Sequence, residues 1–185
     1  IIKAFIQFIN NLPFYGFSII CTDNGNLKKI SKKIKTRNII TYSKNQNNSD
    51  IKILITKKTH KDTEFFLYFK KGVIKNFNGK YKFKTTLLGE HNIQNATAAI
   101  IASLIAGVSI KHIRNALEIF QGVKRRFSFL GKFNKASVYD DYAHHPSEIK
   151  ASYNLAKQIS TKKIIVIFQP HRFSRTNYLY KDFIK

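Results

Sequence analysis

The chain has 185 residues, enough for one domain or for one domain and part of another. Hydrophobic residues make up 43% of it, with 16 Phe, a composition that excludes a disordered or collagen-like chain. The formal net charge is +23, but only six of the 33 basic residues are Arg and the lysines are scattered along the chain. We interpret the charge as a compositional bias, and expect neither nucleic acid nor a membrane as partner.

The single cysteine, Cys21, excludes an internal disulfide and favours a reducing compartment, so a cytoplasmic location is expected. No apolar run approaches the length that crosses a bilayer. The chain contains no Met and opens inside an apolar run. We therefore expect it to be a piece of a longer protein.

The first part alternates helix and strand. Apolar residues recur at helical spacing over 2–12, before Pro13, and again over 27–34. Short apolar runs at 17–21 and 38–42 read as strands between and after these helices. This alternation predicts a parallel sheet covered by helices.

A polar patch at 43–49 marks a change of pattern. Four strand-like runs follow, joined by turns that contain Gly or Asn, as antiparallel hairpins are; they cover 51–56, 64–69, 73–77 and 81–88. A buried helix is expected at 92–106 and a second helix at 110–120.

A different unit is expected from about Val123, so the predicted domains are 1–123 and 124–185. Its predicted strands are 127–133 and 136–141, followed by a helix that begins at Pro146. The apolar run 163–168 is predicted to be a further strand. Strand, helix and strand in this order predict a parallel, right-handed βαβ unit.

Three polar clusters carry the candidate chemistry. In the first, His91, Asn92 and Asn95 stand at the start of the buried helix. Amide side chains offer a donor and an acceptor together, which the edge of an adenine requires. Asn92 acting only as a helix cap is the alternative, and the residues leave both open.

The second cluster joins Arg125 and Arg126 to the run 140–146 (Asp-Asp-Tyr-Ala-His-His-Pro). It lies beyond a strand's carboxyl end, where open α/β sheets bind ligands. Asp141 suits a ribose hydroxyl or a cation, and the arginines suit phosphate. The adjacent His144 and His145 lack the spacing of a zinc site, so no metal ligands are assigned.

The third cluster follows the predicted strand 163–168. Arg172 and Arg175 are three residues apart, so both are predicted to converge on one carboxylate; a solvated basic turn is the alternative. No Gly-x-x-x-x-Gly-Lys-Ser/Thr phosphate loop occurs anywhere in the chain.

In this order the clusters resemble those of the Mur ligases. The matching strings, five in register over nearly the whole chain, are 11–16 (Asn-Leu-Pro-Phe-Tyr-Gly), 89–95, 120–127, 140–146 and 168–173. The resemblance implies an α/β fold: the later half of a central ATP-binding domain, with parallel sheet, antiparallel hairpins and helices, followed by the start of a Rossmann-like C-terminal domain.

The resemblance also implies roles for the site residues. His91, Asn92 and Asn95 are similar to adenine-side contacts, and Asp141 and Tyr142 to nucleotide contacts. Arg126 resembles the arginine near the transferred phosphate and, with His144, is assigned to catalysis. The residues that resemble the family's binding group for the incoming amino acid and the muramoyl carboxyl are His144, His171, Arg172 and Arg175.

The implied reaction is ATP-dependent ligation of L-alanine to the carboxyl of UDP-N-acetylmuramate through an acyl phosphate, for peptidoglycan synthesis, with Mg²⁺ as the accompanying ion. Such a transfer depends on positioning and on neutralising phosphate charge. Three alternatives stay open: a sibling ligase that attaches a preformed peptide, a basic nucleic-acid-binding module, and a truncated product without activity. The 185 residues alone are expected to be inactive, and the oligomeric state is not predicted.

Overall fold

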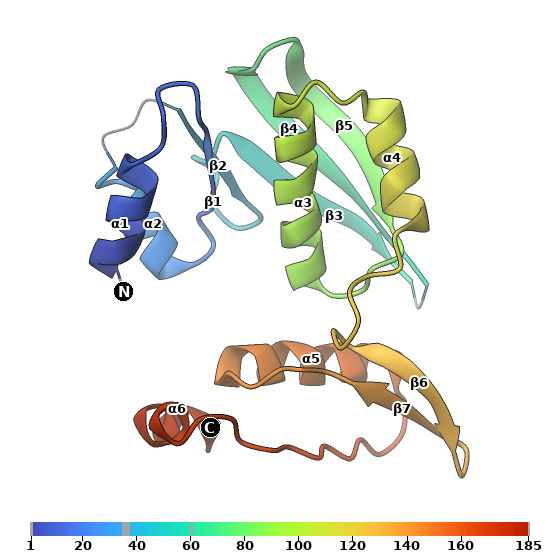
Figure 1. Cartoon of the computed structure of the whole chain (residues 1–185). Coiled ribbons are helices and arrows are strands. Elements are labelled where there is room, and N and C mark those ends of the chain that lie inside the picture. Colours follow the sequence, from blue (N-terminus) through green and yellow to red (C-terminus); the bar gives the residue numbers. More distant parts are fainter. Residues whose placement is uncertain (1, 35–37, 60, 185) are drawn as a thin grey trace. The chain divides into compact units, whose positions relative to one another are not determined.

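The computed structural model describes residues 2–34, 38–59 and 61–184. It divides into two compact units, Ile1–Phe120 and Gln121–Lys185, and each is described by itself (Figure 1). Helices and sheets occur together in both units, so the α/β class expected from the sequence is confirmed.

The first unit is built on one five-stranded sheet in the order β1-β2-β3-β4-β5. β1 (Ser18–Cys21) and β2 (Ile39–Ser43) are parallel, as the alternating pattern predicted. β3 (Ile51–Lys58), expected as the first of the antiparallel strands, is parallel to β2 and antiparallel to β4. β4 (Thr63–Ile74) and β5 (Phe77–Thr85) continue the sheet in antiparallel fashion. The carboxyl ends of the three parallel strands therefore share one edge of the sheet.

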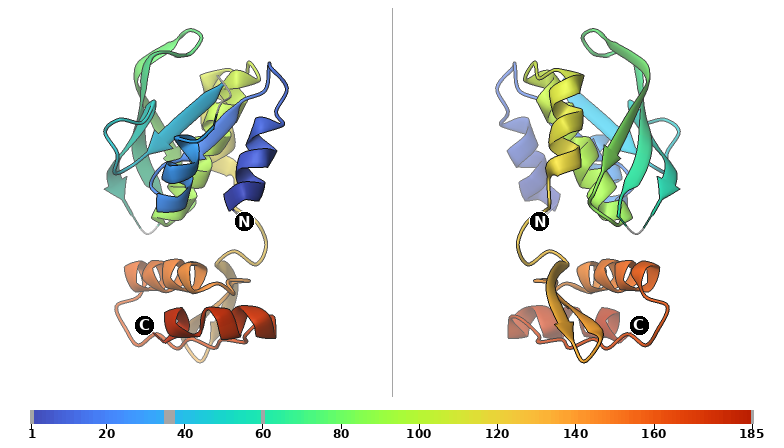
Figure 2. Two further views of the ribbon diagram at one scale, coloured as in Figure 1. Left: turned by 90° about the vertical axis from the view of Figure 1, so that its left-hand side faces the viewer. Right: turned by 90° about the vertical axis from the view of Figure 1, so that its right-hand side faces the viewer.

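Helices cover both faces of this sheet because its strands alternate their side chains. Ile20 packs with residues of α1 (Ile2–Asn10) and α2 (Gly25–Ser31), whereas its neighbours Ile19 and Cys21 face the larger core. That core is formed with α3 (Glu90–Ile105) and α4 (Ile110–Ile119), which Figure 2 shows beside the antiparallel strands. The buried face of α3 thus fixes the helix on the sheet.

The prediction of four strand-like runs after residue 50 was wrong in one respect, because the third run, 73–77, is not a strand of its own but is divided between the end of β4 and the start of β5. β4 continues to Ile74, and Gly72, with φ +83°, lies inside it at an irregular register between Phe69 and Ile74. The hairpin turn comes instead at Asn76, with φ +67°. A glycine within a strand-like run fits either a bulge or a turn, and the sequence does not distinguish the two.

The second unit contains a two-stranded antiparallel sheet, β6 (Ser128–Phe133) and β7 (Ala136–Asp140), followed by α5 (Pro146–Ile159). Pro146 occupies the first turn of α5, as predicted, and His145 with Glu148 forms a capping box. Two short helices, α6 (Phe173–Tyr178) and α7 (Tyr180–Phe183), end the described chain.

The predicted parallel βαβ unit is not formed, and this prediction was wrong. The run 163–168 forms no helix or strand and is drawn as a loop in Figure 1, and β6 and β7 pair only with each other among the described residues. Ile165 and Ile167 are 77% and 95% exposed. A β-strand requires a neighbour for its backbone hydrogen bonds, so an apolar run predicts a strand only where such a neighbour is present.

Apolar burial differs sharply between the two units. The first unit contains nearly all of the buried hydrophobic residues among those described, and the second contributes Leu155. Tyr153 of α5 is exposed. The second unit therefore derives little stability from a hydrophobic core of its own.

Candidate functional site

The first candidate cluster lies at the start of α3, and Gly89 shapes that start. Gly89 has φ +92° and ψ 143° and stands before Glu90 without a side-chain cap. A Cβ on Gly89 would lie 2.9 Å from Cε1 of His91, closer than such atoms approach. The positive φ thus favours glycine at this position, and any other residue would also displace the ring of His91.

Asn92 does not cap α3; its amide Nδ2 donates to the carbonyl of Leu88 at 2.7 Å and secures the loop before the helix. At about 100° per residue, His91 and Asn95 lie on one face of the helix, with Asn92 about 60° further round. Asn95 is exposed, whereas Ile93 and Thr97 are buried. The start of α3 therefore exposes Asn95 to solvent, while Ile93 and Thr97 hold the opposite side of the helix in the core.

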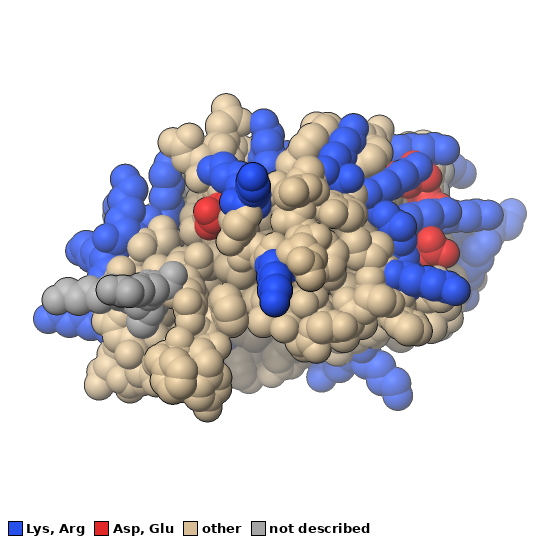
Figure 3. All heavy atoms as spheres, turned by 90° about the horizontal axis from the view of Figure 1, so that it is seen from above, with Lys and Arg blue, Asp and Glu red and all other residues tan. Residues whose placement is uncertain are grey.

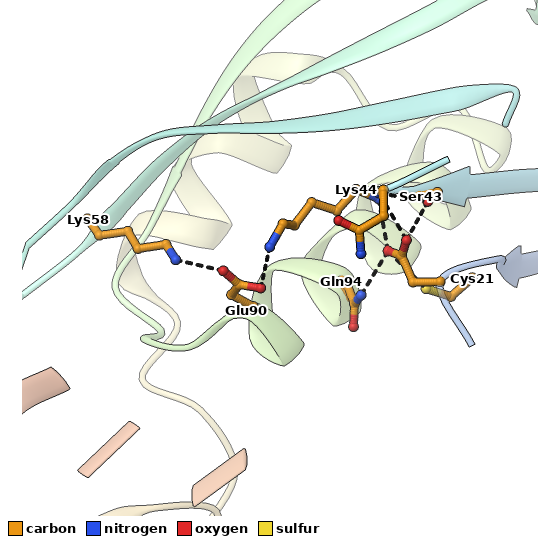
Figure 4. A network of polar contacts seen from close by, with 8 residues as sticks. Cys21, Ser43, Lys44, Lys58, Glu90 and Gln94 are labelled. Atoms are coloured by element: carbon orange, nitrogen blue, oxygen red, sulfur yellow. Dashed lines mark hydrogen bonds and ion pairs between the residues drawn. The ribbon is translucent and has the colours of Figure 1, made fainter. Parts of the chain in front are cut away.

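Sequence reasoning missed Asp23, which follows β1 at the edge where the parallel strands end. Its carboxylate accepts hydrogen bonds from the N–H groups of Lys44 and Asn45, at 2.8 and 3.0 Å, from the hydroxyl of Ser43, and from Nε2 of Gln94 at 3.0 Å (Figure 4). Burial alone would raise its pKa, but these donors outweigh it and hold the pKa of Asp23 below its ordinary value. Asp23 thus stays ionised at neutral pH.

Glu90, also missed, lies in the first turn of α3 between two lysines. Lys44, just after β2, and Lys58, at the end of β3, both donate to its carboxylate, Lys58 at 2.8 Å. Hydrogen bonds from Lys44 and then Lys58 lower the pKa of Glu90. The sequence signal that could have identified Glu90 is its spacing from Gln94, because residues four apart on a helix share one face.

In the second unit, three predicted residues from two separate motifs come together. The ring of His144 lies 5.0 Å from that of Tyr142 and 5.5 Å from that of His171, and the Tyr142 and His171 rings are 6.2 Å apart. Nδ1 of His144 also lies 2.9 Å from the carbonyl oxygen of Tyr142. The chain on either side of α5 thus supplies a cluster of two imidazoles and a phenol.

Asp141 is held at the start of α5. One carboxylate oxygen accepts from the N–H of Ala143 at 2.9 Å, and the other accepts from the hydroxyl of Ser152 at 2.6 Å. These contacts fix the orientation of the carboxylate after β7. It remains an acceptor with further lone pairs available for a hydroxyl group.

Both predicted phosphate-facing arginines make electrostatic contacts within this unit. Arg125 lies 3.3 Å from Asp140, and its guanidinium carbon is 4.8 Å from the centre of the Tyr142 ring. Arg126 lies 3.7 Å from Glu148, with 60% of its side chain exposed. Its contact is long and open to solvent, so Arg126 can exchange Glu148 for a stronger anionic partner at small cost.

Glu148 organises the start of α5 around that arginine. Its carboxylate accepts from the N–H groups of His144 and His145, each at 3.2 Å. Burial would raise the pKa of Glu148, but these two N–H groups and the positive charge of Arg126 lower it. The same carboxylate thus restrains both His144 and Arg126.

The predicted convergence of Arg172 and Arg175 on one carboxylate stays a prediction. Arg172 precedes α6 with φ +68°, and Nη1 of Arg175 lies 3.5 Å from the carbonyl oxygen of His171. This contact places the guanidinium of Arg175 next to the main chain of His171, whose ring lies 5.5 Å from that of His144.

His145 serves a different purpose from its neighbour, since its side chain caps α5 by accepting from the N–H of Ser147. In the described part of the chain, no three His, Cys, Asp or Glu side chains are grouped closely enough to hold a metal ion. A membrane-spanning helix is likewise not found among the described residues.

Figure 3 shows one face of the molecule, whose middle is mostly uncharged. Lysines and arginines lie around it, and those at the right-hand side have acidic side chains among them. A surface hollow of about 540 Å³ is lined by Phe173, Ser174, Thr176, Asn177 and Tyr180. A second hollow, of about 370 Å³, is lined by residues of β3, of β4 and of the loop before β3. Neither lining includes a candidate residue.

Each of the two units matches a domain of known proteins. The Mur ligase middle domain matches residues 1–103, and the Mur ligase, glutamate ligase domain matches residues 125–185. A UDP-N-acetylmuramate–L-alanine ligase from Rickettsia massiliae is 42% identical over 190 aligned residues, covering 100% of this chain and 39% of the relative. The chain thus spans about two-fifths of the length of this relative.

Two solved structures are similar to this one. A UDP-N-acetylmuramate–alanine ligase from Thermotoga maritima is 26% identical, with a TM-score of 0.60 over 84% of this chain and 39% of that protein. A murein peptide ligase from Psychrobacter arcticus is 29% identical, with a TM-score of 0.64 over 85% of this chain and 32% of that protein. The arrangement of elements is shared with both.

Proposed function

This chain belongs to the Mur ligase family, and we propose that the complete protein joins L-alanine to the carboxyl group of UDP-N-acetylmuramate with hydrolysis of ATP. The product would be a peptidoglycan precursor made in the cytoplasm. The observation that carries the proposal is the 42% identity over the whole chain to a protein named for that reaction.

The first unit is proposed to be the later part of the ATP-binding domain, with His91, Asn92 and Asn95 on the adenine side. The geometry supports separate roles for the two amides. Asn92 secures the loop before α3 through Leu88, whereas Asn95 stands exposed on the face shared with His91. Asn95 is therefore the proposed direct contact to the base.

The second unit is proposed to start the C-terminal domain and to supply the charged groups. Asp141 is held as an acceptor for a nucleotide hydroxyl, beside Tyr142. Arg126, with an exposed guanidinium, is assigned to the transferred phosphate. His144 and Arg126 are both assigned to catalysis. His144 is also proposed to bind alanine and the muramoyl carboxyl, together with His171, Arg172 and Arg175.

The residues present fit a nucleotide, because an exposed amide, an oriented carboxylate and a loosely paired arginine are the groups that a base, a sugar and a phosphate require. When bound, ATP supplies the phosphoryl group that activates the carboxylate for attack by the alanine amine. Mg²⁺ is proposed as the ion that accompanies the triphosphate, and the proposal assigns it no ligands among the described residues.

The test is the amino-acid dependence of phosphate release by the complete protein. With ATP and UDP-N-acetylmuramate present, L-alanine should release phosphate in step with a product heavier by one alanine residue. A tripeptide substrate should give little release. Phosphate release that does not depend on alanine, with no such product, would contradict the proposal.

A murein peptide ligase is the second candidate, favoured by one observation. The solved structure of that name has a slightly higher TM-score and identity than the solved alanine ligase. The two values are too close to separate the candidates, whereas the Rickettsia relative at 42% identity is named an alanine ligase. Tripeptide-dependent release in the same assay would establish this alternative instead.

A further inference from the structure

Five side chains fasten the start of α3 to the ends of three parallel strands. We call this group the clasp: Asp23 after β1, Lys44 after β2, Lys58 at the end of β3, and Glu90 and Gln94 on α3 (Figure 4). Gln94 donates to Asp23, and both lysines donate to Glu90. Each of the three strand ends therefore has a polar contact with the helix.

Lys44 closes the clasp because it makes two separate contacts. Its main-chain N–H donates to the Asp23 carboxylate at 2.8 Å, while its ammonium group donates to Glu90. Glu90 and Gln94 are neighbours on the helix surface, four residues apart. The contacts thus run from Gln94 to Asp23, through Lys44 to Glu90, and back along the helix to Gln94.

The two clasp residues of α3, Glu90 and Gln94, lie on the side of the helix adjacent to the side that bears the proposed nucleotide contacts. At about 100° per residue, the Glu90–Gln94 side is displaced by about 100° from the side that bears His91 and Asn95. A rotation of the first turn would therefore move both nucleotide contacts together. The buried residues Ile93 and Thr97 resist such rotation from the core side, and the clasp resists it from the strand-end side.

We propose that Lys44, Glu90 and Gln94 are positioning residues for the nucleotide, which set the rotation of the first turn of α3 through the clasp. This inference rests on the proposed role of His91 and Asn95. The absence of a side-chain cap at Gly89 supports it, since the first turn is restrained by these contacts in place of a cap. The lowered pKa values of Asp23 and Glu90 keep both carboxylates charged at neutral pH.

The test is Lys44→Met, which removes the ammonium group but keeps the main-chain N–H that Asp23 accepts. In the 185-residue chain, amide hydrogen exchange at residues 90–95 should rise by about twofold to fivefold, the range for a partly exposed ion pair. In the complete protein, the KM for ATP should rise by a similar factor. The KM for alanine and kcat should not change.

A matched control is available in the same unit. Lys82 and Glu64 form an ion pair at 2.8 Å between neighbouring strands and do not involve α3. Lys82→Met should change neither the exchange at 90–95 nor the KM for ATP. Lys44→Arg, which keeps the charge, should restore both values towards those of the unchanged protein.

The outcomes separate this inference from the proposed function. Equal effects of Lys44→Met and Lys82→Met on the KM for ATP would overturn the positioning role, as would faster exchange with an unchanged KM. Faster exchange together with a raised KM that Lys44→Arg reverses would support it. If the unchanged complete protein shows no alanine-dependent phosphate release, the proposed function fails, and the positioning role falls with it while the exchange result still describes the clasp.

Discussion

Replacing Arg126 with alanine in the complete protein is expected to slow alanine-dependent turnover at least tenfold. The guanidinium of Arg126 lies 3.7 Å from Glu148 and is largely exposed, so it is available to an incoming phosphate. A hydrogen bond to a charged group contributes roughly 1.5–3 kcal/mol. Since about 1.4 kcal/mol corresponds to a factor of ten in rate, the loss should exceed one order of magnitude.

The measurement is steady-state phosphate release with saturating substrates, with circular dichroism to confirm folding. Arg114→Ala is the matched control, because Nε of Arg114 donates to the carbonyl of Lys82 in the first unit, outside the candidate residues. Arg126→Lys should give an intermediate rate, since lysine keeps the charge but not the planar fork. Wild-type turnover by Arg126→Ala would remove this residue from the site.

Replacing Phe65 with alanine is expected to lower the free energy of unfolding of the first unit by roughly 3–5 kcal/mol. Phe65 is fully buried, stacks on Phe83 with ring centroids 5.9 Å apart, and belongs to the core that includes Ile93 and Ile100 of α3. The cavity would therefore lie beneath the helix that bears the proposed nucleotide contacts.

Phe66 is the control, because it is the next residue on β4 and points to the opposite face of the sheet. There Lys80 covers its ring at 3.9 Å, and the side chain is only half-buried. Phe66→Ala should cost about 1.5 kcal/mol or less. Urea unfolding of the 185-residue chain compares the two variants, and equal losses would contradict the assignment of the core.

The first unit followed the sequence closely because its patterns are local and reinforce each other. Helical spacing before Pro13 and the short apolar runs around Ile20 and Ile40 each gave an element of the expected type. The merged strand β4 was missed because the conformation of Gly72 depends on pairing with β5. The run 163–168 was mispredicted because its apolar residues indicate a strand without indicating a partner.

The candidate site was only partly predictable for the same reason. Motifs identified Tyr142, His144 and His171, and the fold brings their rings together. Asp23 and Lys44 carry no motif, since their contacts with α3 depend on where two strands end. Strand ends meet only in the folded sheet, so no local pattern identifies such residues.

The most direct measurement of the central claim, that the first turn of α3 holds the base of ATP, is photolabelling of the complete protein with an azido-adenine analogue of ATP. Peptide mapping should place the label within residues 89–96. Excess ATP should prevent the labelling, and Asn95→Ala should reduce it. A label found only elsewhere, or one that neither ATP nor Asn95→Ala affects, would contradict the claim.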